Sequence, residues 1–588
     1  MQMLLLAILF SVSTAAPLRA YVTVSAGGQL QLSQGSPPPG ENVLAHASYD
    51  GPALNFTGWS TLSITANASE PNATLASYAA GLLEGYLLAE ELATYALNTG
   101  AAQPNSKRLQ KFLDDNMQWM QAQVSALAAS DPYWAHVRAV LAQLQGEVDG
   151  QALAGGSLSW ATLYQDLLLG GDMFNLAPLY GASPQQLSGT PLLARASAAR
   201  GQRSGRADHC SALVKLTPGA KDLLVAHTTW SGFESLGRVV KRYDLALAGV
   251  TGEAVPGRVT LLSGYPGLLQ YSSDDLYINA PSGLVTLETT IDNNNHTLAQ
   301  EYADHRVVLE WLRNVLANRL ASSASSWAQI FSRYASGTYT NQWMLLDTRR
   351  FSPGTPPPPG TFLVLEEMPG NIRVHDRTPV LTSTEAGTTL FGPGLWASFN
   401  VVSDPFLFNI SGQQELVDKY GGAGSAGAFF TWLNTSRANI FRREGGSVVD
   451  VASCAHMIRY NEFRTDPAST LGCGTHPPFS ATNAIADRSD LNVKGGDYVI
   501  PDLGHGDAAG IDAKVVSLAW LTPSRLDAGD LSMALQSGPT VTASCPVFSF
   551  GDKADKVKAS HVGYPEVYNF SFVLAQGAGE LSITNLTL

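Results

Sequence analysis

The feature that most constrains the fold is a change of sequence pattern across residues 181–209. Before it, residues 78–173 carry apolar side chains three and four positions apart, which predicts helices with core-facing stripes. After it, residues 210–216 and 222–230 are short, largely apolar runs joined by a turn at Thr217-Pro-Gly, which predicts two adjacent strands. The chain therefore has a helix-rich first part and a second part that begins with strands.

Residues 181–209 are themselves predicted to be a mobile, protease-sensitive linker. The segment has few aromatic residues and is rich in Gly, Ser and Ala. It also carries Arg195, Arg200, Arg203 and Arg206. A basic stretch can recruit a polyanion, but four spaced arginines in an acidic protein favour the linker.

The remainder of the chain alternates strand and helix signals. Further strands are predicted at 258–262, 284–290, 361–367 and 497–499, and a helix is predicted at 307–320. No internal repeat is visible. Residues 210–588 are therefore expected to form one large unit of interspersed strands and helices.

Charge and length exclude several classes of function. The 588 residues include 36 Lys and Arg against 49 Asp and Glu, which gives a formal net charge of −13. A chain this long can bury a large core. Nucleic acid and anionic membrane surfaces are disfavoured as partners, because both require a clustered basic surface.

The first 20 residues have the pattern of a secretory signal peptide. They form an apolar run that ends in small residues, with cleavage expected after Ala16 or Ala20; the alternative is a short N-terminal anchor. No later segment reaches the length of a transmembrane helix. Eight Asn-x-Ser/Thr sequons add to this pattern: Asn55, Asn67, Asn72, Asn295, Asn409, Asn434, Asn569 and Asn585. A glycoprotein of the lysosomal lumen or the extracellular space is expected, and the sequence does not separate the two.

Four cysteines are too few for a disulfide scaffold, although two of Cys454, Cys473 and Cys545 could pair. No C-x-x-C or H-E-x-x-H spacing occurs, so neither a metal site nor a cofactor is expected. The G-x-S-x-G elbow of α/β-hydrolases is also absent. The glycine-rich run 422–427 follows a helical pattern rather than a strand, which argues against a nucleotide site.

Cys210 stands directly after the linker and at the start of a predicted strand. If the chain were cut before it, the thiol nucleophile and an α-amine base would belong to one residue, and the ordinary pKa of such an amine, near 8, suits proton abstraction. The alternative is a small buried cysteine in the core.

The blocks around Cys210 resemble the phospholipase B-like (lamina ancestor) family, within the N-terminal nucleophile hydrolases. The resemblance rests on Asp208-His-Cys-Ser-Ala-Leu-Val-Lys and Asp222-Leu-Leu-Val-Ala-His-Thr-Thr-Trp, followed in order by blocks that include 336–343, 398–400, 437–443, 484–491 and 511–514. It implies an α+β fold, an αββα four-layer sandwich, and self-cleavage between His209 and Cys210. The layout would be a signal peptide (1–20), a helix-rich N-terminal chain packing on the core (21–180), an excisable linker (181–209) and the hydrolase core (210–588).

The same resemblance implies roles for individual residues. Cys210 would be the nucleophile and, through its amine, the general base. His227 would orient the amine or the substrate, unless it is a structural histidine, and Thr229 and Trp230 would line the same strand end. Asn400 would be the oxyanion donor, with a turn asparagine as the alternative. Thr290 and Arg437 would stabilise charge in the pocket, a role that Arg442 or Arg443 could also take. The family commonly has Ser-Tyr-Asn where this chain has Ser398-Phe-Asn.

The expected function is hydrolysis of phospholipid acyl chains through a thioester on Cys210, with a phospholipid or another acyl-lipid as the partner. An amidase acting on N-acylated lipids or peptides is the second hypothesis. A non-catalytic lumenal lipid-binding glycoprotein is the third. The oligomeric state stays open, with a homodimer as one option.

Overall fold

The computed structural model describes residues 16–25, 28–40, 42–67, 73–100, 106–164, 170–180, 210–248, 250, 252–267, 269, 276–383, 390–551 and 559–588. Most of the predicted signal peptide, the whole predicted linker with His209, and the sequon Asn72 lie outside these residues. No helix within the described ranges is both long enough and apolar enough to cross a bilayer.

The larger sheet joins strands that precede residue 181 with strands that follow residue 209. Eleven strands of the described chain lie in the order β13-β12-β11-β10-β9-β8-β7-β4-β3-β1-β2. Neighbours are antiparallel except β4 and β7, which pair in parallel where the two parts of the chain meet. The bounds are β1 Leu18–Val24, β2 Leu30–Gln34, β3 Val43–Asp50, β4 Ser60–Asn67, β7 Val239–Ala246, β8 Val259–Gly264, β9 Leu276–Ala280, β10 Leu284–Thr290, β11 Asn341–Asp347, β12 Phe362–Met368 and β13 Asn371–Asp376.

The smaller sheet begins at Cys210. Its main path is β14-β5-β6-β16-β17-β20-β21, with β15 paired to β6, and all of these neighbouring strands are antiparallel. The bounds are β5 Cys210–Leu216, β6 Leu223–Gly232, β14 Leu395–Ser398, β15 Ala508–Gly510, β16 Asp512–Ser517, β17 Leu531–Ser537, β20 Val573–Gly577 and β21 Ser582–Asn585. A separate pair consists of β18 Phe548–Ser549 and β19 Val567–Tyr568.

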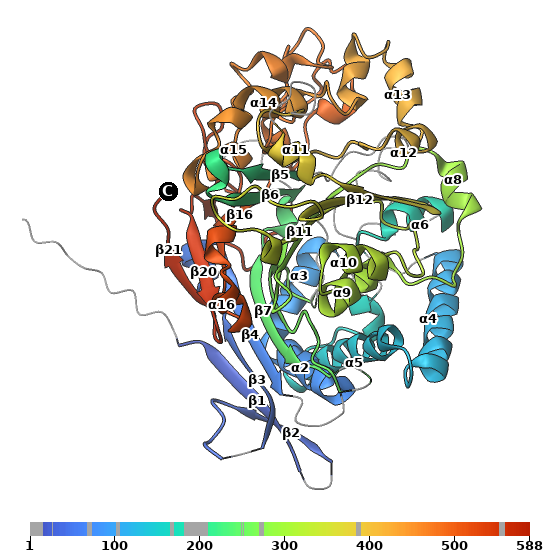
Figure 1. Ribbon diagram of the computed structural model, residues 1–588, viewed down its shortest axis with the longest axis vertical. Helices are drawn as coiled ribbons and strands as arrows, with labels where there is room; N and C mark the ends of the chain where they lie inside the picture. Colours follow the sequence, from blue (N-terminus) through green and yellow to red (C-terminus); the bar gives the residue numbers. More distant parts are fainter. Residues whose placement is uncertain are drawn as a thin grey trace, which may run out of the picture.

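Helices cover the outer faces of both sheets, and Figure 1 shows α14 and α15 over β5, β6 and β16, with α2, α5, α9 and α10 at the other side of the molecule. The bounds are α1 Leu54–Thr57, α2 Ala73–Leu87, α3 Ala89–Thr99, α4 Lys107–Leu127, α5 Pro132–Leu153, α6 Met173–Tyr180, α8 His296–Glu301, α9 Glu310–Leu320, α10 Ala324–Phe331, α11 Thr378–Thr382, α12 Pro405–Ile410, α13 Gln413–Lys419, α14 Ser436–Glu444, α15 Val451–Ile458 and α16 Pro523–Asp527.

The core follows from the two-residue period of the strands. On β5, Ala212 and Val214 enter the apolar layer between the two sheets, whereas Leu213 packs toward α14 and α15. Because β5 is buried on both faces, its sequence is a nearly continuous apolar run. The layers are therefore helices, sheet, sheet and helices, and the predicted α+β layered sandwich is confirmed.

Local predictions fared unevenly. The strand at 284–290 and the helix at 307–320 are present as β10 and α9, and helices dominate 73–180, although 18–67 adds four strands that the sequence did not predict. The strand predicted at 497–499 is wrong. Tyr498 makes only an isolated bridge to Cys473. Glycine at 495 and 496 and proline at 501 disfavour a continuous strand, because glycine is conformationally free and proline has no N–H to donate to a ladder.

Candidate functional site

Cys210 is the first residue of β5 and is fully buried. Its backbone N–H donates to Asn400 Oδ1 at 3.0 Å, and its backbone carbonyl accepts from Arg437 Nη1 at 2.7 Å. The backbone N–H and the backbone carbonyl of Cys210 are thus both held by side chains that come from distant parts of the chain.

Asn400 lies just after β14, which pairs with β5. Its backbone adopts the left-handed conformation at φ +68°, which asparagine tolerates better than most residues. Its Oδ1 accepts from Cys210 N and from Arg437 Nη1, the latter at 2.8 Å, and its Nδ2 donates to the backbone carbonyl of Thr290 at 2.7 Å. These partners fix the orientation of the amide. The predicted oxyanion donor is this same Nδ2, which donates to Thr290 O in the structure. The oxyanion role of Asn400 therefore stays a prediction.

Arg437 is the second residue of α14, whose N-cap Thr435 accepts from Ala438 N. Its guanidinium is buried, also donates to Ser211 Oγ at 3.3 Å, and lies 4.4 Å above the ring of Trp230. Arg442 and Arg443 are exposed, and Arg443 pairs with Asp466 instead. Of these three arginines, Arg437 is therefore the one that contacts Cys210.

His227 lies on β6 opposite Ala212, two residues along the strand from the partner of Cys210. Its Nε2 donates to the backbone carbonyl of Glu288 at 2.9 Å, while Nδ1 has no hydrogen-bond partner among the described residues. Burial, reinforced by the positive charges of Lys514 and Arg238, lowers the pKa of His227 well below its ordinary value. This environment favours the neutral imidazole.

Thr229 is the residue directly opposite Cys210 in the ladder of β5 and β6. Its backbone N–H donates to Asp512 Oδ1 at 2.9 Å, and its Oγ1 accepts from Lys514 Nζ at 2.6 Å. Asp512 and Lys514 belong to the sequence block 511–514, but no role for either residue was predicted from the sequence. They are functional candidates that sequence reasoning missed.

Thr290 and Trp230 complete the predicted set. Thr290 offers its backbone carbonyl to Asn400, and its hydroxyl lies 2.7 Å from Tyr339 Oη. Trp230 Nε1 donates to Ile485 O, and the ring lines a cavity of about 20 Å³ beside Arg437 and Phe429. A cavity of this size holds about one water molecule, so it does not accommodate an acyl chain in this conformation.

Comparison with known proteins decides the family. The family model described as Phospholipase B matches residues 45–575. The chain belongs to the phospholipase B family. It is 36% identical over 571 residues to "Putative phospholipase B-like 2" of Rattus norvegicus, and this alignment covers 94% of this chain and 89% of the rat protein. It is 36% identical over 559 residues to the Homo sapiens protein of that name, covering 92% and 87%, and 33% identical over 522 residues to "Phospholipase B-like protein B" of Dictyostelium discoideum, covering 88% and 83%.

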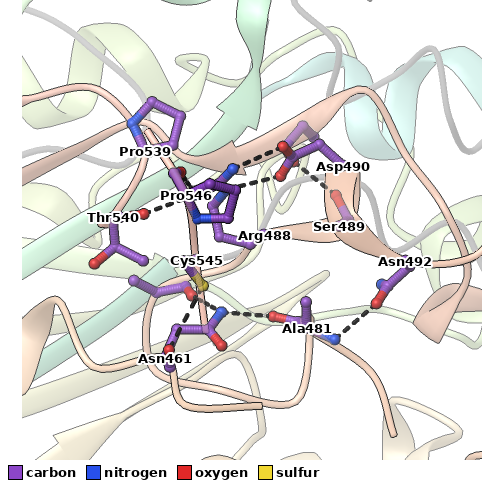
Figure 2. Close-up of polar contacts among 12 residues, drawn as sticks. Asn461, Ala481, Arg488, Ser489, Asp490, Asn492, Pro539, Thr540, Cys545 and Pro546 are labelled. Carbon is purple, nitrogen blue, oxygen red and sulfur yellow. Dashed lines mark hydrogen bonds and ion pairs between the residues drawn. The ribbon is translucent and has the colours of Figure 1, made fainter. Parts of the chain in front are cut away.

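In this phospholipase B family member, polar contacts of Arg488 and Asn461 hold the segment that includes Ile485, the partner of Trp230. Figure 2 shows the contacts of Arg488, here called the Arg488 clamp. Arg488 binds both oxygens of Asp490, at 2.8 and 3.0 Å, and donates to the carbonyls of Thr540 and Pro546. Asn461 Nδ2 donates to the backbone carbonyl of Ala481 at 2.8 Å, a contact that Figure 2 also shows. The sequence block 484–491 therefore has a structural role, because it carries Ile485, whose backbone carbonyl accepts from Trp230 Nε1.

The sequons and cysteines of the phospholipase B chain lie in different surroundings. Asn55, Asn409, Asn434, Asn569 and Asn585 are exposed. Asn295 is half-buried, and its Nδ2 donates to Ile410 O at 2.9 Å. Cys454, Cys473 and Cys545 all lie within the described residues and are free thiols, so no two of them are paired.

Proposed function

We propose that this chain is a self-processing hydrolase that removes fatty acyl chains from phospholipids through a thioester on Cys210. The observation that carries the proposal is the convergence of Asn400 and Arg437 on the backbone N–H and carbonyl of Cys210. A residue that acts through both its thiol and its α-amine needs its backbone nitrogen held in place. Membership of the phospholipase B family supports a lipid-hydrolase type of activity.

Maturation begins when the Cys210 thiol adds to the carbonyl carbon of His209. The bond between that carbon and the Cys210 nitrogen breaks, and the nitrogen takes the thiol proton, which leaves a thioester between the two residues. Water then hydrolyses the thioester to a carboxylate on His209 and a free thiol on Cys210. Asn400 Oδ1, which accepts from the backbone N–H in the intact chain, is placed to accept from the new amine.

Turnover uses the same two groups of Cys210. The amine takes the thiol proton, and the sulfur attacks the ester carbonyl of the lipid to form an acyl thioester. The lipid alcohol leaves with the proton from the ammonium. The amine then takes a proton from water, the resulting hydroxide attacks the thioester, the fatty acid is released and the thiol is restored.

The test compares the protein purified from a secretory host with its C210A variant on phosphatidylcholine vesicles and on matched N-acyl amides. C473S is the control, because Cys473 is a free cysteine outside the site. Fatty acid release that C210A abolishes and C473S retains supports the proposal. Release from the amide alone would identify an amidase instead. Lipid capture without release, in a protein whose N-terminus is Cys210, would identify the binding protein.

The route through the secretory pathway, to the lysosomal lumen or out of the cell, is part of the same proposal. The exposure of five sequon asparagines supports it. Peptide mapping should find glycans at these five positions and lower occupancy at Asn295, because Ile410 engages its Nδ2. A protein from its native source with no glycan at any sequon would contradict the route.

A further inference from the structure

Two buried glutamates lie close together where α2 packs against α5. Glu84 on α2 and Glu147 on α5 are both inaccessible to solvent. The two helices meet backbone to backbone, because a Cβ atom at Gly85 would collide with the carbonyl oxygen of Glu147, and one at Gly146 with the carbonyl oxygen of Tyr78. Contact this close fixes the helices relative to each other and holds both carboxyl groups away from water.

The carboxylate of Glu84 has its partners on β7. It accepts from Lys241 Nζ at 2.7 Å and from Tyr243 Oη at 2.7 Å. The strand β7 also pairs in parallel with β4. Glu84 therefore belongs to the contacts that join the part of the chain before residue 181 to the part after residue 209.

Glu147 differs from Glu84, because neither of its carboxyl oxygens has a hydrogen-bond partner among the described residues. A buried carboxylate without a partner is far more costly than the neutral acid. Burial and the negative charge of Glu84 raise the pKa of Glu147 well above its ordinary value, and the positive charge of Lys241 opposes them. No other charge of the described residues acts on this carboxyl, including those of α3 and α4, which also pack on α5.

Three more ionisable groups lie around the two glutamates. Arg319 on α9 donates from Nη2 to Gln143 Oε1 at 2.6 Å, one turn before Glu147 on α5. Burial and the charges of both glutamates raise the pKa of Tyr243 well above its ordinary value, which favours the neutral phenol. Burial lowers the pKa of His136, also on α5, to about 3, which favours the neutral imidazole.

We infer that the folded protein keeps Glu147 protonated, and that release of this proton weakens the contact between the two parts of the chain. An ionised Glu147 would place a second buried negative charge beside the ion pair of Glu84 and Lys241. The contribution of Glu147 to the free energy of unfolding is fully present below its unfolded pKa, near 4.3, and is lost as pH rises. This inference does not depend on the role of Cys210. Taken with the proposed secretory route, it favours the acidic lumen over the neutral exterior as the compartment in which the protein works.

The test measures urea unfolding at about pH 5.5 and about pH 7.5. It is done in the C210A chain, which lacks the thiol that would cut the chain, so that a single chain unfolds. E147Q is added to this chain, because glutamine has the shape of the protonated carboxyl and releases no proton. E415Q is the matched control, since Glu415 is exposed on α13.

Between the two pH values the folding equilibrium constant should fall about 100-fold more in the chain with Glu147 than in E147Q, because one proton held only by the folded state is worth about tenfold per pH unit. E415Q should fall like the chain with Glu147. The infrared difference between the chains with and without Glu147, at about pH 7, should contain the C=O band of a protonated carboxylic acid.

Equal falls in the two chains, or a carboxylate band in place of the acid band, would overturn the inference. If E147Q does not fold, E147M should lose the same pH dependence, and an unchanged dependence in E147M would overturn the inference too. Failure of the proposed route would show differently, as a protein without a glycan at any sequon.

Discussion

The side-chain oxygen of Asn400 lies 3.0 Å from the backbone nitrogen of Cys210, and both residues are buried. The two residues are 190 positions apart in sequence, and β14 brings them together by pairing with β5. In an intact chain this contact holds a peptide N–H, and in a processed chain it would hold an amine. The same contact therefore serves both steps of the proposed chemistry.

Replacing Asn400 with alanine should impair both steps. The N400A variant leaves the Cys210 nitrogen and the Arg437 guanidinium with one acceptor fewer in a buried site. We expect about 1–3 kcal/mol of lost stability and a fall in acyl release of about 100-fold. Urea unfolding and fatty acid release measure the two effects. N439A, at an exposed position of α14, should behave like wild type, and a fully active N400A would exclude Asn400 from the site.

Arg437 should be irreplaceable even by lysine. Its Nη1 contacts the Cys210 carbonyl and Asn400 Oδ1 at once while the guanidinium lies over Trp230, and an ammonium cannot reproduce this planar arrangement. R437K should lose acyl release by about 100-fold, whereas R442A should retain it. If R437K retained acyl release as fully as R442A, the planar guanidinium of Arg437 would not be required.

Asp487, next to the Arg488 clamp, should make stability depend on pH. Burial raises the pKa of Asp487 to about 7. The folded state holds the proton of the Asp487 carboxyl more tightly than the unfolded state does. The contribution of this carboxyl to the free energy of unfolding is therefore fully present below the unfolded pKa, near 4, and is lost as pH rises toward 7. D487N should therefore gain stability relative to wild type by about 3 kcal/mol between about pH 5 and pH 7.5. Urea unfolding at both pH values measures it, and parallel curves for the two proteins would show that Asp487 has no raised pKa.

The Arg488 clamp should carry a large share of the local stability. R488A leaves Asp490 without its bidentate partner and frees two backbone carbonyls. We expect a loss of about 3–5 kcal/mol, together with reduced acyl release, because Ile485 holds Trp230. Chemical denaturation monitored by tryptophan fluorescence measures the loss. R464A, at an exposed position, should change stability by less than about 0.5 kcal/mol, and a similarly small effect of R488A would contradict the clamp.

Motifs pointed to residues that the structure brings together, and their roles stay predictions. Cys210, Asn400, Thr290 and Arg437 were chosen from the sequence by family resemblance, and the structure brings all four together through direct hydrogen bonds. The strands β5 and β6 could also be predicted, because both are short, largely apolar segments that are buried in the structure.

The parts that could not be predicted depend on long-range contacts. Lysine, arginine and aspartate are usually exposed, so sequence alone gave no reason to bury Arg238, Asp512 and Lys514 together. The burial of Asp512 and Lys514 follows from the pairing of β6 with β16, which joins segments almost 300 residues apart. The strands β1 to β4 are a similar case, because only their pairing with one another and with β7 makes them part of the larger sheet.

The most direct test of the account is the N-terminal sequence and intact mass of the protein purified from a secretory host, before and after exposure to mildly acidic pH. The account predicts a chain that begins at Cys210 and ends at Leu588, and it predicts that C210A yields no such chain. A protein that stays intact, or that is cut only at other positions with Cys210 still internal, would contradict it, because the α-amine base would then not exist.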